Sequence, residues 1–162
     1  MKISKKSIDK TYFSYEIVQK LMNSAKSKYK VLMAVQFDSG ARISELKNIK
    51  IKDIEEVPNS DELFLTLKSR KTSERKIKLM LSQNLVKQWI KEQRLKPDDY
   101  LFKLCPKSTN LYYKKLGQKI VGKPFSMNDL RYDSFCYWNT KIKENELMHR
   151  FGYELRGGIN EI

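Results

Sequence analysis

The sequence has few of the side chains that bind metal ions. Among its 162 residues are one histidine, His149, and two cysteines, Cys105 and Cys136, which lie far apart in the chain. A structural or catalytic zinc ion needs three or four such ligands, so zinc fingers and zinc-dependent deaminases are excluded. We expect both cysteines to be buried as small apolar side chains in a protein from a reducing compartment.

Long apolar runs are also missing. Residues 1–10 are basic but lack the apolar core of a signal peptide, and no later run is long enough to span a bilayer. The sequence therefore predicts a soluble, cytoplasmic protein with no membrane partner. We expect residues 1–13 to form a basic arm ahead of a single domain over residues 14–162.

Negative charge is scarce relative to positive charge. The chain has 33 lysines and arginines against 19 aspartates and glutamates, which gives a net charge of +14. The excess is spread along the chain, which indicates a polyanionic partner, nucleic acid first and an anionic membrane surface second. A lysine-rich composition without such a partner is the alternative.

The spacing of apolar residues predicts a mainly α-helical domain with one small antiparallel sheet, an α+β arrangement. Residues 62–67 and 76–80 alternate in polarity around a polar tip, which is typical of a β-hairpin. We expect the helices to begin at Ser14, near Tyr29, beside Arg42, at Ser82, at Ser108, at Ser126 and near Glu144. We find no internal repeat and no linker that would divide the chain.

One segment combines a turn signal with a helix start around an arginine. Residues 39–46 read SGARISEL, and Arg42 falls where the turn becomes the helix. An arginine held by a rigid turn suits phosphate binding, because its planar guanidinium can bind two oxygens at once. An ordinary surface arginine beside a helix start fits this segment equally well.

Two further basic residues follow in a fixed order, with Lys71 on the hairpin tip and Arg131 near a helix start. With them, the chain resembles the catalytic domain of tyrosine recombinases, the phage-type integrases. The first arginine motif of that family resembles residues 39–46, and its hairpin Lys-Thr step resembles residues 71–72, with Lys68 as the alternative lysine. Its His-x-x-Arg box resembles NDLR at residues 128–131, and its Leu-Gly-His resembles FGY at residues 151–153.

The resemblance implies a reaction and a set of site residues. In this family a tyrosine attacks a phosphodiester of double-stranded DNA and forms a 3′-phosphotyrosyl bond, without a metal or cofactor. Arg42 and Arg131 would stabilise the phosphorane, and Lys71 would protonate the leaving 5′ oxygen. Asn128 and Tyr153 would donate hydrogen bonds to the phosphate. DNA contacts are expected from Lys68, Arg70, Lys114 and Lys115.

The chain departs from the family pattern at three places. Asn128 replaces the usual histidine, and its amide can donate a hydrogen bond but cannot exchange a proton. Tyr153 replaces a second histidine or a tryptophan. No tyrosine follows Tyr153, although the nucleophile of the family comes shortly after this position. We therefore expect a catalytic domain without its nucleophile segment and without the N-terminal domain that clamps DNA.

Two other interpretations stay open at this point. The chain could be a non-catalytic DNA-binding or regulatory derivative on the same fold, or a basic helical domain unrelated to DNA. Convergence of Arg42, Lys71 and Arg131 on one site would separate the last interpretation from the others. The resemblance also implies a monomer in solution that forms a tetramer on DNA when intact. It implies a mobile element of a prokaryotic host, with the protein near the nucleoid.

Overall fold

A computed structural model describes residues 11–69 and 74–153 of the chain. Lys71 and Arg70, and most of the expected basic arm, lie outside the described residues. The α-helices of the described part are α1 (Tyr15–Ser24), α2 (Ser27–Ser39), α3 (Ile43–Lys47), α4 (Gln83–Gln93), α5 (Pro106–Val121), α6 (Met127–Asn139) and α7 (Glu144–Phe151). The strands are β1 (Ile54–Glu56), β2 (Leu63–Leu67) and β3 (Arg75–Leu79).

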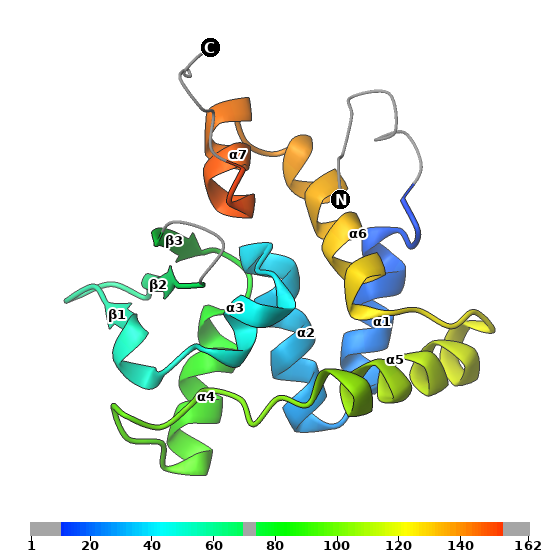
Figure 1. The fold of residues 1–162 in the computed structure, drawn as a ribbon, viewed down its shortest axis with the longest axis horizontal. Helices are drawn as coiled ribbons and strands as arrows, with labels where there is room; N and C mark the ends of the chain where they lie inside the picture. Colours follow the sequence, from blue (N-terminus) through cyan, green and yellow to red (C-terminus); the bar gives the residue numbers. More distant parts are fainter. Residues whose placement is uncertain (1–10, 70–73, 154–162) are drawn as a thin grey trace.

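Helix α2 is at the centre of the molecule (Figure 1) and packs against α1, α4, α6 and β3. Every residue from Val31 to Ser39 is buried, so α2 is covered on all sides and not along a single stripe. The prediction of a mainly helical domain with a small antiparallel sheet is confirmed. Among the described helices, none has the length and hydropathy that a bilayer span requires.

The sheet follows the chain in the order β1-β2-β3, with antiparallel pairing throughout. The predicted hairpin is confirmed, with Leu65 opposite Ile77 in its register. Strand β1 is an addition that the sequence did not signal. It has three residues that are largely exposed, so it shows no apolar alternation by which a strand is recognised.

The predicted helix starts can be compared with the N-caps in the structure. Ser14 and Ser126 are N-caps as expected, and Ser126 forms a capping box with Asp129. The expectation for Ser108 was wrong, because α5 begins earlier, at Pro106. Proline suits the first turn of a helix since the amide it lacks would have no intrahelical partner there.

The two cysteines differ in their surroundings. Cys136 is buried in α6, as expected. Cys105 is exposed at the junction where the chain enters α5, so the expectation of a buried side chain was wrong for this residue. Its position before a helix start places it outside the apolar stripe of α5, which explains the difference.

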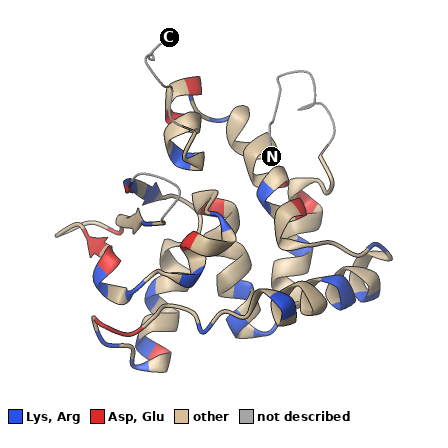
Figure 2. Cartoon of the chain, viewed as in Figure 1, with Lys and Arg blue, Asp and Glu red and all other residues tan. Residues whose placement is uncertain are grey.

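Helix α5 presents an exposed basic surface. Figure 2 shows lysines along this helix and no acidic residue on it. The exposed lysines are Lys107, Lys114, Lys115 and Lys119. The side of the helix that faces the protein contains the buried Thr109, Tyr113 and Leu116.

A carboxylate of α6 binds the segment that precedes α1. Asp133 is 2% exposed, and its two oxygens accept the backbone N–H groups of Tyr12 (2.6 Å) and Phe13 (2.9 Å). Burial raises the pKa of Asp133 from 3.8 to about 6, despite these two hydrogen bonds.

This raised pKa predicts a pH-dependent contribution to stability. Between about pH 4 and 6 the folded state binds the proton and the unfolded state has lost it. Asp133 therefore contributes less to the free energy of unfolding as pH rises through this window, by at most about 3 kcal/mol. Urea unfolding of the wild type and Asp133→Asn at several pH values measures the effect. The unfolding free energy of the wild type should fall relative to that of Asp133→Asn as pH rises from about 4 to 6. A difference that stays constant with pH would contradict the prediction.

Candidate active site

Arg42 stands at the joint between α2 and α3. Gly40 is the C-cap that follows α2, and its φ of +66° turns the chain there. A β-carbon added to Gly40 would lie 2.6 Å from the ring of Phe151. Arg42 is the N-cap of α3, and its backbone N–H donates to Oε1 of Glu45 (2.8 Å). The backbone of Arg42 is thereby fixed, while its side chain is 27% exposed to solvent.

Arg131 lies in α6 and reaches the same joint from another direction. Its Nε donates to the carbonyl of Gly40 (3.1 Å), and its Nη2 donates to the carbonyl of Phe151 (3.0 Å). Its third nitrogen, Nη1, donates to the hydroxyl of Tyr153 (3.3 Å). Arg131 therefore links three elements that are distant in the sequence, namely α6, the turn before α3 and the end of α7.

Tyr153 follows α7 and lies against both arginines. Its ring centroid is 5.3 Å from Cζ of Arg42 and 5.6 Å from Cζ of Arg131, within range of cation–π attraction. The aromatic ring thus closes one side of the pair.

A surface depression of about 370 Å³ opens beside these residues and is lined by Arg42, Ile43, Ser44, Asn128 and Arg131. Asn128 is exposed in the first turn of α6. The structure therefore brings Arg42, Asn128 and Arg131 to one place, with Tyr153 in contact with both arginines.

The other basic residues expected at the site lie elsewhere or are not described. Lys71 and Arg70 lie outside the described residues. Lys68 follows β2, and its Nζ is 3.1 Å from Oδ1 of Asp53, which raises the lysine pKa. Lys114 and Lys115 are exposed on α5 and do not line the depression.

The depression is electropositive, and the guanidinium of Arg42 is not fully hydrogen-bonded within the described part of the chain. Desolvation lowers the pKa of Arg42, and the charges of Arg131 and Arg75 lower it further, against the opposing effect of Glu45. Among the described residues, Nη1 of Arg42 has no hydrogen-bond partner although it is buried. The Arg42 side chain as a whole is 27% exposed and lines the depression, so its charge would stabilise an anion bound there.

Sequence reasoning missed Arg75 as part of this site. Arg75 is the first residue of β3, is 6% exposed and forms a buried ion pair with Glu45. The period-two alternation of β3 places Arg75 on the same face as the buried Ile77 and Leu79. An arginine on the apolar face of a strand was the signal that could have identified it.

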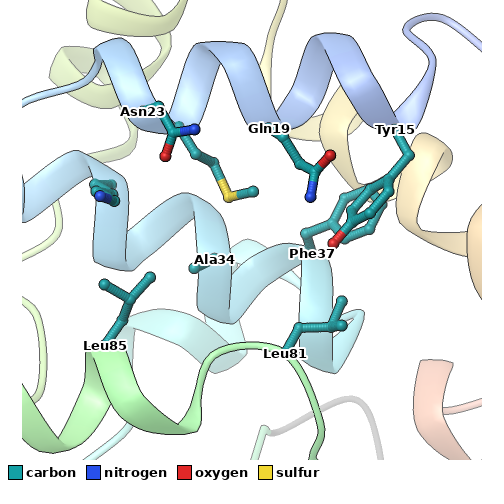
Figure 3. Close-up of a pocket in the computed structure, with 9 residues that line it drawn as sticks. Tyr15, Gln19, Asn23, Ala34, Phe37, Leu81 and Leu85 are labelled. Carbon is teal, nitrogen blue, oxygen red and sulfur yellow. The ribbon is translucent and has the colours of Figure 1, made fainter.

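A second hollow of about 320 Å³ lies between α1, α2 and α4 (Figure 3), and neither Arg42 nor Arg131 lines it. It is lined mainly by apolar and amide side chains, including Gln19, Ala34, Phe37 and Leu85. Within the part of the chain that the structure describes, no three histidine, cysteine or acidic side chains gather as a metal site would require.

Comparison with known proteins decides the family. The sequence pattern of the Phage integrase family matches residues 12–155. The chain belongs to the phage integrase family. The resemblance inferred from the arginine motifs is therefore confirmed at the level of the family. A search of curated protein sequences finds no match.

Solved structures of integrases share the fold. The XerH site-specific recombinase bound to difH substrate superimposes with a TM-score of 0.72 at 16% identity, over 89% of this chain and 47% of that chain. The XerA recombinase gives 0.71 at 18% identity, over 89% of this chain and 56% of that chain. The lambda integrase catalytic core gives 0.63 at 17% identity, over 89% of this chain and 92% of that core. This integrase-family chain thus spans about half the length of XerH and nearly all of an integrase catalytic core.

Proposed function

We propose that this chain is the DNA-cleaving domain of a tyrosine recombinase, which cuts and rejoins DNA strands at specific sites. The observation that supports this most is the convergence of Arg42 and Arg131 on one depression, where the Arg42 side chain is 27% exposed. Family membership makes DNA the natural anionic ligand, and the net charge of +14 agrees with it.

The geometry suits stabilisation of a phosphoryl transition state. As an oxygen attacks the phosphodiester, negative charge grows on the non-bridging oxygens of the phosphorane. The guanidinium groups of Arg42 and Arg131 would stabilise that charge, because the turn before α3 and the hydrogen bonds of Arg131 hold both before the substrate arrives. Asn128 can add an amide donor from the rim of the depression.

Lys71 remains our choice for the acid that protonates the leaving 5′ oxygen. The alternative, Lys68, is hydrogen-bonded to Asp53, which raises its pKa and makes it a weaker proton donor at neutral pH. Lys71 lies outside the described residues, so this assignment rests on the family motif and on the pairing of Lys68.

The nucleophile is not identified in the printed sequence, which has no tyrosine after Tyr153. Tyr153 is held between the two arginines and accepts a hydrogen bond from Arg131, which suits a residue that orients the phosphate site. We propose that the attacking tyrosine comes from a segment outside this sequence. A tetramer on paired DNA sites is proposed for the intact protein, by analogy with the lambda integrase tetramer bound to a Holliday junction.

A second candidate function is DNA binding without cleavage, as in a regulatory derivative. Asn128 favours it, because an amide at this position cannot transfer a proton. Both candidates use the same depression and differ only in whether a covalent bond to DNA forms.

A trapping experiment separates the two candidates. The chain, and a version extended along its natural reading frame, are incubated with nicked duplexes whose sequence is randomised around the nick. We expect the extended chain to form a covalent adduct, which Arg42→Ala abolishes and Lys91→Ala, an exposed residue of α4, leaves intact. Salt-sensitive binding without an adduct from either chain would favour the non-catalytic function. Absence of binding would contradict both.

A further inference from the structure

Three guanidinium groups meet at the candidate active site, and one of them is closed to ligands. Arg75 uses all three of its nitrogens within the protein. Nε donates to the carbonyl of Arg150 (3.1 Å), Nη2 donates to Oε1 of Glu45 (2.9 Å) and Nη1 donates to Oε2 of Glu45. Its side chain is 4% exposed. Arg75 does not line the depression, so it is not placed to contact a phosphate itself.

Glu45 connects Arg75 to Arg42. Its side chain is fully buried, and Oε1 accepts both the backbone N–H of Arg42 and Nη2 of Arg75. The same oxygen lies 3.9 Å from Nη1 of Arg42, which is too far for a hydrogen bond. Glu45 thus faces two guanidinium groups. It accepts two hydrogen bonds from Arg75, whereas Arg42 is only nearby.

The end of α7 keeps the two guanidinium groups at their places. Gly152 has a φ of +75°, and a β-carbon added to it would lie 2.6 Å from Nη1 of Arg42 and 2.8 Å from Nη1 of Arg75. The backbone therefore packs directly on both side chains, as only glycine allows.

We propose that Arg75 is a positioning residue, which neutralises Glu45 and so keeps the Arg42 side chain free to bind a DNA phosphate. A buried carboxylate needs a cationic partner, and charge-assisted pairs with arginine form where geometry allows. Without Arg75, the nearest cation to Glu45 among the described side chains is Arg42. Glu45 would then draw Nη1 of Arg42 into a direct hydrogen bond and move the guanidinium away from the depression. The proposal rests on the function proposed above.

The experiment measures the salt dependence of DNA binding. A fluorescein-labelled duplex is titrated with each variant at several salt concentrations, and thermal unfolding of each variant is recorded. Arg42→Ala should remove one phosphate contact and reduce the slope of log K against log salt by about 0.9. Arg75→Met should reduce the slope by the same amount, although Arg75 itself touches no ligand. Arg75→Met added to Arg42→Ala should reduce it no further.

A suppressor variant distinguishes positioning from a purely structural role. Glu45→Gln removes the carboxylate charge and keeps an oxygen for the Arg42 backbone, so it should restore the slope in the Arg75→Met background. A structural role alone would lower the unfolding temperature and leave the slope unchanged. If Arg75→Met does not fold, Arg75→Gln has the same expected results, because it keeps a donor for the Arg150 carbonyl but not the charge.

Two results would overturn the proposal for Arg75 and leave the proposed function standing. One is a folded Arg75 variant with the wild-type slope, and the other is a reduced slope that Glu45→Gln does not restore. If Arg42→Ala itself leaves the slope unchanged, the phosphate site of the proposed function fails as well. The two failures are therefore distinguishable in one set of titrations.

Discussion

Replacing Arg131 by alanine is expected to reduce strand cleavage by at least about a hundredfold, in a chain that has its nucleophile. Arg131 lines the depression, so its loss would remove positive charge from the proposed phosphate site. The same change leaves the buried carbonyls of Gly40 and Phe151 without their donor. We expect this to lower the free energy of unfolding by about 3 kcal/mol.

Arg131→Lys separates the two effects. Lysine keeps the positive charge but lacks the planar fork that reaches both carbonyls and a phosphate together. We expect it to recover part of the stability and little of the cleavage, as measured by adduct formation and urea unfolding. Lys91→Ala on α4 serves as the control for a lost positive charge far from the depression. Cleavage within about tenfold of wild type by a folded Arg131→Ala variant would refute the role, since removal of one oxyanion donor costs more than that elsewhere.

Asp38→Ala should have the largest effect on stability. The carboxylate of Asp38 is fully buried at the end of α2. It accepts the backbone N–H groups of Met80 (3.1 Å), Leu81 (2.9 Å) and Ser82 (2.8 Å) and the hydroxyl of Ser82 (2.7 Å). It also faces Arg150 of α7 at 3.7 Å, and that arginine is 5% exposed.

Alanine at position 38 would leave three backbone donors and a buried guanidinium without this carboxylate. Removal of one member of a buried ion pair costs about 3–5 kcal/mol, and we expect a loss in that range. The measurement is the urea midpoint of unfolding, with Asp38→Asn as the isosteric comparison. Asparagine keeps one acceptor oxygen and should lose less. A loss below about 1 kcal/mol for alanine would show that the network is not needed for stability.

Local signals in the sequence were sufficient for much of the fold and for the backbone position of Arg42. Apolar periodicity predicted the hairpin, and serine caps predicted the starts of α1 and α6. The turn before Arg42 placed that arginine at a fixed backbone position, as the structure has it. The prediction for α5 failed because a proline competes with Ser108 for the helix start, and both are acceptable near an N-terminus.

The sequence by itself determined the family, the α+β character and the positions of Arg42 and Arg131 within their elements. Only the tertiary structure decided which buried charges pair, such as Glu45 with Arg75 and Asp38 with Arg150. Periodicity records whether a side chain faces the core, because the period of an element is a local property. It does not record the partner, because pairing depends on how elements distant in the chain pack together. The depression beside Arg42 and Arg131 is a product of that packing.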